Sequence, residues 1–390
     1  MQKRFTPDAG GVFPEWEEKT IEEACNVNVS NGTPGDKFIY IELGDVNKYG
    51  LLKRKNLVRK NEAPVSAKRV AKIDDVFFRS VRPGNKGHFH YTNEMSEQVV
   101  MSSAFFQLSM KDGDNEFLYQ TLNTQYFTKQ VLTRCTGTTY PTISLNEFIK
   151  LKIKIPKSIE EQRKIAAALA AYDEMIAVKT AKLETWQECK KRMVKEIFGR
   201  TKRFRDDDGN EFPEWEEKTL GEVCKYGNTH KTGKNYINVE NMNKDFSGVT
   251  FLEPSLERKG IVYDVGDVLM SNIRPYLRKA WLADRGGVCD SDVLVFHLKD
   301  GVNVDSTFLY YTIASSEFVK WSMIGARGTK MPRCDKQHLL EKRIFLPCMT
   351  EQQKIGSFLA EIDKEIEIQK EFIKTYAEGK RRMMRELMEG

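Results

Sequence analysis

The stretch that decides the fold of this chain is residues 158–198, SIEEQRKIAAALAAYDEMIAVKTAKLETWQECKKRMVKEIF. Apolar residues recur in it at alternating spacings of four and three, which is the heptad pattern of a coiled coil. The pattern predicts a single helix of about eleven turns with an apolar seam along one side. So long a seam needs a partner to cover it.

Residues 350–388 carry the same pattern and can supply that partner. Polar residues interrupt both seams at the same two steps, Lys179 with Gln369 and Lys190 with Lys380. We therefore expect two long helices that pack on each other. The predicted apolar seam positions are Ile165, Leu169, Tyr172, Ile176, Leu183, Trp186, Met193, Ile355, Leu359, Ile362, Ile366, Ile373, Tyr376 and Met383.

The two helices belong to an internal repeat of the whole chain. The octapeptide FPEWEEKT stands at residues 13–20 and again at 212–219, and Lys3-Arg4-Phe5 returns as Lys202-Arg203-Phe204. Two copies imply pseudo-twofold symmetry, and two copied helices that share one seam satisfy it by running antiparallel. Weaker matches follow in the same order: Asp75 with Asp267, Arg82-Pro83 with Arg274-Pro275, and Gly137-Thr138 with Gly328-Thr329.

Each copy joins a globular part to a long helix. Residues 1–156 and 200–347 are the expected globular parts, the second preceded by a charged linker, and residues 157–199 and 348–390 are the expected helices. Shorter strands are predicted at 37–43, 75–78, 151–155, 236–239, 267–270, 294–297 and 343–346, and shorter helices at 115–133 and 306–323. The sequence thus predicts an α+β fold with two similar domains separated by an antiparallel coiled coil.

Composition narrows the class of protein. A length of 390 residues suits two or three domains, and a net charge of +6 is a mild basic excess that permits a polyanionic partner. No apolar run approaches the ~20 residues of a membrane span, and the first residues lack a signal-peptide core, so we expect a cytoplasmic protein. Seven cysteines without a Cys-x-x-Cys pair argue against a disulfide framework and a zinc finger.

Motifs for catalysis are missing from the sequence. It has no glycine-rich phosphate loop and no Asn-Pro-Pro-aromatic motif of an adenine methyltransferase. His88 and His90 could chelate a metal ion, but no cysteine or carboxylate stands at a supporting spacing, so no metal site is predicted. Glu17-x-Lys19 matches the skeleton of many metal-dependent nucleases; we favour the simpler interpretation that its charges are solvated beside packed aromatic residues. No catalytic residue is predicted.

Signals for binding are stronger than those for catalysis. Basic residues cluster after the Asp75 strand and again after the Asp267 strand, at the Arg-Pro pair of each copy. Arginine can bind guanine or phosphate, and tyrosine can pack on a base or sugar. A solvated basic loop is the alternative, and recurrence in both copies favours binding. The candidate residues are Arg79, Arg82, Lys86, His88, Arg274, Tyr276, Arg278 and Lys279.

Two glycine-rich loops form a second pair of binding candidates. Glycine lets backbone amides approach a phosphate closely, although glycine and threonine also make ordinary turns, and both interpretations stay open. Lys53-Arg54-Lys55 with Arg59 and Lys60 has no counterpart of equal density in the second copy, a difference that would belong to what each domain recognises. The candidate loop residues are Thr138, Thr139, Tyr140, Arg327, Thr329 and Lys330.

The order of these motifs resembles that of a known family. Each long helix begins after a strand and a proline with Glu-Gln-x-Lys-Ile, at residues 161–165 and 351–355. Together with FPEWEEK and the Gly-Thr turn, this order is similar to that of the DNA specificity subunits of type I restriction-modification systems. The resemblance covers essentially the whole chain.

The resemblance implies that residues 1–156 and 200–347 are target-recognition domains, each binding one half of a split sequence in double-stranded DNA. It implies that the helices of residues 157–199 and 348–390 are spacers that dock two modification (methyltransferase) subunits, with two restriction subunits where the system has them. No cofactor is expected in this chain, because S-adenosylmethionine, ATP and Mg²⁺ belong to those partners. The alternatives are a self-contained endonuclease that uses Glu17-x-Lys19 and a coiled-coil adaptor with no nucleic-acid role.

A spacer helix predicts how the target responds to helix length. One heptad inserted into each long helix should change the gap between the two half-targets and leave both half-sequences unchanged, because ~1.5 Å is added per residue without touching either domain. Mapping methylated adenines in the host genome would measure both. Altered half-sequences with an unchanged gap would contradict a spacer role.

Overall fold

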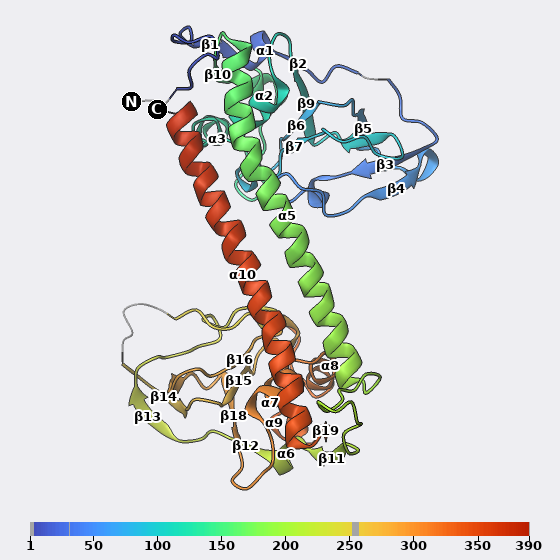
Figure 1. Cartoon of the computed structure of the whole chain (residues 1–390), viewed down its shortest axis with the longest axis vertical. Coiled ribbons are helices and arrows are strands. Elements are labelled where there is room, and N and C mark those ends of the chain that lie inside the picture. Colours follow the sequence, from blue (N-terminus) through green and yellow to red (C-terminus); the bar gives the residue numbers. More distant parts are fainter. Residues whose placement is uncertain (1–3, 31, 252–256, 390) are drawn as a thin grey trace. The chain divides into compact units, whose positions relative to one another are not determined.

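The computed structural model describes residues 4–30, 32–251 and 257–389. Its contacts divide the chain into two compact units: residues 1–182 with 369–390 form the first unit, and residues 183–368 form the second. Each unit therefore contains part of each long helix, α5 (Ile159–Phe198) and α10 (Met349–Met388) (Figure 1). The domain boundaries predicted from the repeat divide the sequence differently, because they keep each long helix whole. Those boundaries stay a prediction.

The first unit contains three sheets, ordered β1-β10, β2-β9-β6-β7 and β4-β3-β8-β5. All strand pairs are antiparallel except β3 with β8. The strands are β1 (Glu17–Thr20), β2 (Cys25–Val27), β3 (Lys37–Ile41), β4 (Asn56–Arg59), β5 (Ala67–Val70), β6 (Val76–Arg79), β7 (Phe89–His90), β8 (Val99–Ser102), β9 (Phe105–Met110) and β10 (Lys152–Ile155). The short helices are α1 (Ile21–Ala24), η1 (Leu43–Asp45), η2 (Lys60–Glu62), η3 (Pro83–Asn85), α2 (Asn115–Leu122), α3 (Gln125–Thr133) and α4 (Leu145–Phe148).

The second unit repeats two of these sheets, as β11-β19 and β12-β18-β15-β16, and has a three-stranded sheet β13-β14-β17 as its third. Its strands are β11 (Glu216–Thr219), β12 (Cys224–Tyr226), β13 (His230–Gly233), β14 (Arg258–Tyr263), β15 (Val268–Ser271), β16 (Ala280–Leu282), β17 (Gly287–Cys289), β18 (Val293–Leu298) and β19 (Arg343–Leu346). Its short helices are α6 (Leu220–Val223), η4 (Pro275–Leu277), α7 (Ser306–Ile313), α8 (Ser316–Ile324) and α9 (Lys336–Leu340).

Most predicted elements are present, and three predictions need correction. The helix predicted at 115–133 is split into α2 and α3, because the Thr124 hydroxyl accepts a hydrogen bond from the Phe127 amide and begins a new helix. Ser315 divides the helix predicted at 306–323 into α7 and α8 in the same way. The strand predicted at 236–239 is wrong, since Ile237 makes only an isolated bridge to Cys289.

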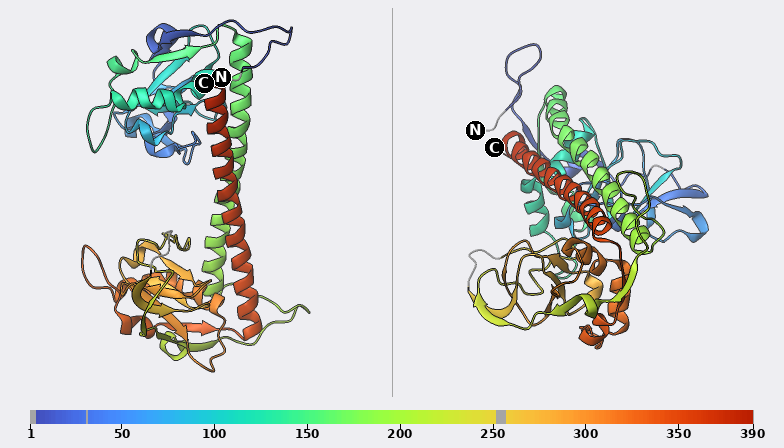
Figure 2. Two further views of the ribbon diagram at one scale, coloured as in Figure 1. Left: turned by 90° about the vertical axis from the view of Figure 1, so that its left-hand side faces the viewer. Right: turned by 60° about the horizontal axis from the view of Figure 1, so that its bottom comes forward.

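The long helices contribute directly to the core of each unit. In the first unit, Ile165 and Leu169 of α5 and Leu387 of α10 join a cluster that contains Phe117 and Phe148. Asp173 contacts Lys380, and Lys179 lies 4.5 Å from the ring of Phe372, so residue numbers rise along α5 as they fall along α10. The antiparallel packing predicted from the seam is confirmed within this unit, and Figure 2 shows the two helices side by side.

In the second unit, the remaining parts of the same helices contribute to the core in the same way. Met193 and Ile197 of α5 share a core cluster with Ile355 and Leu359 of α10. Of the predicted seam residues, Ile165, Leu169, Ile176, Met193, Ile355, Leu359, Ile362, Ile366 and Ile373 are buried. The others, Tyr172, Leu183, Trp186, Tyr376 and Met383, are partly exposed.

Charged groups fill the polar steps of the seam. Lys380 is 8% exposed, and its ammonium lies 2.6 Å from Oδ1 of Asp173 within the first unit. Lys190 lies 2.5 Å from Asp363 at the matching step of the second unit. Each lysine is thus paired with an aspartate of the other helix, and the pairing satisfies a charge that would be costly to bury alone.

A buried carboxylate fixes the start of each long helix. Glu161 is fully buried, and Arg4 donates two hydrogen bonds to it, at 2.9 and 2.8 Å. The neighbouring Gln162 accepts from the Asp114 amide and donates to the Pro156 carbonyl, at 2.9 and 2.8 Å. These contacts join the N-terminal segment, the start of α2 and the end of β10 to the first turn of α5.

The same contacts recur in the second unit. Glu351 is fully buried and accepts from Arg203 at 2.9 Å and from the indole of Trp215 at 3.0 Å. Gln352 accepts from the Asp305 amide and donates to the Pro347 carbonyl, at 2.9 and 2.8 Å. The repeated Lys-Arg-Phe and Glu-Gln-x-Lys-Ile motifs are therefore the two halves of one clamp.

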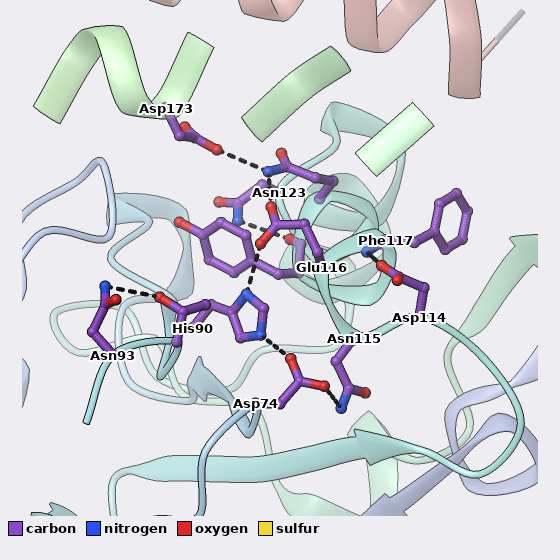
Figure 3. A network of polar contacts seen from close by, with 12 residues as sticks. Asp74, His90, Asn93, Asp114, Asn115, Glu116, Phe117, Asn123 and Asp173 are labelled. Carbon is purple, nitrogen blue, oxygen red and sulfur yellow. Dashed lines mark hydrogen bonds and ion pairs between the residues drawn. The ribbon is translucent and has the colours of Figure 1, made fainter. Parts of the chain in front are cut away.

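A polar network connects the sheets of the first unit to its helices (Figure 3). His90 is held between Glu116 at 2.7 Å and Asp74 at 2.8 Å. Gln120 donates to Asp173 of α5 at 2.8 Å and also to Glu116. Burial by itself would lower the pKa of His90, but its hydrogen bonds and charge interactions with Glu116 and Asp74 raise that pKa above 6.5.

Removing one arginine of the clamp should loosen the start of the helix. Arg4→Ala leaves the Glu161 carboxylate buried without its ionic partner, and loss of a buried pair of this kind costs about 2–3 kcal/mol when one partner is partly exposed. Hydrogen exchange of the amides in residues 159–170 should quicken accordingly. Arg163→Ala, on the exposed side of the same helix, is the matched control. Equal exchange in both variants would contradict the clamp.

His90 should make the stability of the first unit depend on pH. Because its pKa is raised above 6.5, the stabilisation is fully present below about pH 6.5 and is lost as the pH rises through the raised pKa. Thermal unfolding of wild type and His90→Gln between pH 6 and pH 9 would measure this loss. His230→Gln, at an exposed histidine of the second unit, serves as the control. The difference between His90→Gln and wild type should shrink as pH rises, and a constant difference would refute the prediction.

Candidate nucleic-acid interface

The Arg-Pro pair of the first unit forms a tight turn at the end of β6. Arg82 adopts the left-handed conformation, with φ 48° and ψ 53°, and Pro83 begins η3 directly after it. The Arg82 amide donates to the Pro141 carbonyl at 2.6 Å, and Val81 forms a bridge with Thr142. The turn is therefore fastened to the glycine-rich loop that follows α3.

That loop is closed on itself by a small backbone ladder. The amides of Thr136 and Thr142 each donate to the other's carbonyl at 2.9 Å, and Gly137 at φ +87° turns the chain between them. A side chain at Gly137 would be strained at this positive φ. The Arg-Pro turn and the Gly-Thr loop thus form one composite surface, which we call the first turn-loop site, residues 80–86 and 136–142.

The second unit builds the same surface from residues 272–278 and 327–333, the second turn-loop site. Arg274 has φ 50° and ψ 58°, and its amide donates to the Pro332 carbonyl at 2.7 Å. Ile273 and Arg327 both form bridges with Arg333, and Gly328 has φ +97°. Every backbone contact of the first site has its counterpart here.

Backbone strain marks both sites at equivalent positions. Arg82 and Arg274 open each turn with a positive φ, and Lys86 and Arg278 close it with φ 56° in both cases. Such conformations are uncommon for residues other than glycine and cost of order 1–3 kcal/mol each. Two copies that keep the same strain at the same two positions indicate a functional demand on the geometry of the turn.

The side chain of Arg82 is already oriented at the first site. Its guanidinium lies 3.9 Å from the centre of the Tyr140 ring, and one of its N–H groups donates to the Thr139 carbonyl at 3.2 Å. Tyr140 is 63% exposed, so this stacked pair faces solvent. Beside it lies a hollow of about 300 Å³ lined by Arg82, Gly84, Asn85, Leu132 and Pro141.

The second site presents more charge and a different aromatic residue. Tyr276 is 49% exposed at the turn, and the guanidinium of Arg278 lies 5.0 Å from the Phe246 ring. Arg327 lies 3.4 Å from Asp335, and Arg333 is paired with Asp292. The two sites therefore share a backbone but carry different side chains.

Several predicted contact residues instead stabilise the turn from inside. His88, which was predicted as a DNA contact, is 2% exposed, stacks on Phe78 and accepts a hydrogen bond from the Arg79 amide, so its ring is packed inside the turn in this structure. Burial lowers the pKa of His88 well below its usual value. The Lys86 ammonium points inward to the Asn123 carbonyl at 2.9 Å and to the Thr128 hydroxyl, and burial lowers the pKa of Lys86 to about 8.

Two more basic residues that were predicted as DNA contacts donate hydrogen bonds to backbone carbonyls. Lys279 donates to the Val239 carbonyl at 2.6 Å, and burial lowers its pKa. Arg79 donates to the Val81 carbonyl at 2.9 Å and is half-buried, which lowers its pKa as well. Both side chains are thus hydrogen-bonded to the backbone in this structure. The predicted residues exposed at the surface are Thr138, Thr139, Tyr140, Tyr276, Arg327, Thr329 and Lys330.

Residues that the sequence did not single out complete the sites. Asn85 and Leu132 line the hollow of the first site, and Arg333 and Asp292 form an ion pair at the second. Arg333 directly follows Pro332, so its place in the repeat could have indicated it. Leu132 gave no such signal, because its exposure of 46% depends on how α3 packs.

The suggested nuclease motif lies elsewhere, on β1. Glu17 and Lys19 form an ion pair of 2.6 Å with each other, and both are substantially exposed. Within the described residues, no three histidine, cysteine, aspartate or glutamate side chains group so as to hold a metal ion. Nor does any described helix combine the length and apolarity needed to cross a membrane.

Sequence comparison finds relatives over most of the chain. Residues 14–185 and 213–375 match the family described as type I restriction modification DNA specificity domain. The MjaVIII specificity subunit of Methanocaldococcus jannaschii is 25% identical over 76% of this chain and 75% of its own length. The MjaIX specificity subunit of the same organism is 22% identical over 92% and 89%.

Solved structures show the same fold at low sequence identity. The S subunit of a type I restriction-modification system from M. genitalium has a TM-score of 0.60 at 14% identity, over 98% of this chain and 99% of that one. A chain from a type I R-M system studied for complex assembly has a TM-score of 0.51 at 20% identity, over 96% and 97%. With both copies of the repeat matched by the family, the chain belongs to the type I restriction-modification DNA specificity family.

Proposed function

We propose that this chain recognises a split target in double-stranded DNA, with one half-target bound by each unit. The observation that carries the proposal is the pair of turn-loop sites, built alike in both units of a chain that belongs to the DNA specificity family. Each site combines arginine, exposed threonine hydroxyls and a glycine-bearing loop. Those groups are suited to binding phosphate and sugar.

The two turn-loop sites have the same backbone geometry, and this indicates which part of DNA they contact. The sugar-phosphate backbone is the part of DNA that is the same in both half-targets, so we expect the shared geometry to bind it. Arg82 and Arg274 would each neutralise phosphate from a rigid turn, with neighbouring hydroxyls completing the contact. We therefore assign these sites to positioning the DNA rather than to recognition of its bases.

The chemistry of the system is assigned to partner subunits. We propose that two methylating subunits dock on the chain and bring S-adenosylmethionine, and that restriction subunits, where the system has them, bring ATP and Mg²⁺. The chain itself would supply target choice and orientation.

Incubation of the purified chain alone with DNA and magnesium should give no cleavage, and cleavage would favour an endonuclease instead.

Removal of one site arginine should weaken DNA binding without changing the target. In the complex with its methylating partner, Arg82→Gln or Arg274→Gln should lower affinity for every duplex to a similar degree. Loss of one phosphate contact should also reduce the slope of log K against log salt by about 1. Gel-shift titrations at several salt concentrations would measure both quantities.

Arg163→Gln is the matched control, because Arg163 is an exposed arginine of α5 outside both sites. It should leave affinity and slope close to those of the wild type. An unchanged slope in Arg82→Gln, or a change in the preferred bases, would contradict the assignment to phosphate.

A further inference from the structure

The two units differ most in their third sheet. Both contain the two-stranded sheet and the four-stranded sheet described above, with the same order of equivalent strands. The remaining sheet is β4-β3-β8-β5 with one parallel pair in the first unit, and β13-β14-β17 with antiparallel pairs only in the second. Divergence is thus concentrated in one part of an otherwise repeated architecture.

That divergence bears on how two different half-targets are distinguished. If each unit binds its own half-target, as proposed above, the discriminating contacts belong where the units differ. The turn-loop sites, whose arginine and backbone geometry recur in both units, are assigned above to the sugar-phosphate backbone. The third sheets are the largest elements that differ between the two units, so their surfaces are where side chains that contact base edges are expected.

In the first unit, the outer strand β4 and its flanks carry a dense basic surface. Within the described part of the chain, none of these basic side chains makes an ion pair. Leu57 lies among them and is 51% exposed. The exposed basic residues are Lys53, Arg54, Lys55, Arg59 and Lys60, and we call this set with Leu57 the β4 edge.

In the second unit, the outer strand β13 lies beside β14 (Figure 1), and basic residues on and next to these two strands form a comparable set. Thr232 pairs with Lys259 and Gly233 with Arg258, so segments 25 or more residues apart come together. The exposed residues His230, Lys231, Lys234, Arg258 and Lys259 form what we call the β13 edge. The β13 edge was not recognised from the sequence as the counterpart of the β4 edge, because its charged residues lie in two separate segments.

Protection of the sheet is an alternative reason for charge at an edge. Lysine on an outer strand prevents unwanted pairing with other chains. The β4 edge does not fit that role alone, since a half-exposed leucine in its centre would favour association rather than prevent it. Arginine, which donates two parallel hydrogen bonds to guanine, is also present on both edges, at Arg54 and Arg59 and at Arg258.

The chemistry of these edges matches the major groove. The groove admits a two-stranded β-ribbon, arginine or lysine binds the O6 and N7 acceptors of guanine, and an apolar side chain contacts the methyl group of thymine. The β4 edge has both kinds of group, with Leu57 between Arg54 and Arg59. The β13 edge has the basic kind, together with the Thr232 hydroxyl.

We propose that the β4 edge and the β13 edge are the base-recognising surfaces of the chain, one for each half-target. This inference rests on the proposed function. The proposal gives the two surfaces of each unit separate roles: the turn-loop site binds the backbone of the DNA, and the edge strand determines which bases are accepted.

Selection from a random duplex library tests whether the edge strands determine which bases are preferred. The complex of the chain with its methylating partner would be used to enrich bound duplexes, which are then sequenced. Arg54→Gln with Arg59→Gln should reduce discrimination at one or more positions of one half-target by about tenfold, the loss expected for a bidentate contact, and leave the other half-target unchanged. Lys231→Gln with Arg258→Gln should do the reverse.

Each outcome has a distinct meaning. The unaffected half-target shows in every selection that the variant complex is folded and active. Arg82→Gln is the matched control and should preserve both half-sequences. Edge variants that bind every duplex more weakly and keep both half-sequences would overturn the inference while leaving the proposed function intact. A wild-type complex that enriches no sequence would instead overturn the proposed function.

Discussion

The buried carboxylate at the start of each long helix is the interaction on which the rest of the structure depends. Glu161 and Glu351 are fully buried, and a charge in that position is stable only when it is paired and hydrogen-bonded. The pairing arginines come from segments more than 140 residues earlier in the chain. Each unit therefore closes around its helix only when the correct N-terminal segment is in place.

Once the helix start is fixed, the adjoining glutamine transmits its position to the sheets. Gln162 and Gln352 bind the amides that begin α2 and α7 and the prolines that end β10 and β19. The strands β6 and β15 pack over those helices and end in the two strained turns. A continuous series of hydrogen-bonded and packed elements thus connects a buried ion pair to the surface assigned to DNA.

Local patterns made the long helices predictable. The division of the shorter helices and the composition of the candidate sites depend on individual hydrogen bonds, side-chain directions and strand pairing, which the sequence could not show. The heptads of residues 158–198 predicted α5 within one residue, because the period is a property of neighbouring turns. The break before α3 depends on one hydrogen bond that the Thr124 hydroxyl accepts from the Phe127 amide, which helix propensity does not reveal. His88 and Lys86 stand beside Arg82 in the sequence, yet their side chains turn inward, since the direction of a side chain in a turn is set by φ and ψ. The β13 edge was hidden for a related reason, as its residues meet only through strand pairing.

The way each unit draws on both long helices has a consequence for synthesis of the chain. The first unit's core includes Met384, Leu387 and Met388, so its apolar surface stays incomplete until residue 388 has left the ribosome. Domains usually fold one after another during translation, and contacts between distant segments delay that process. The second unit, which is continuous from residue 183 to 368, can close first. The first unit needs residues 369–390 as well as residues 1–182. The second unit can therefore complete its core before the first, although most of the first unit is synthesised earlier.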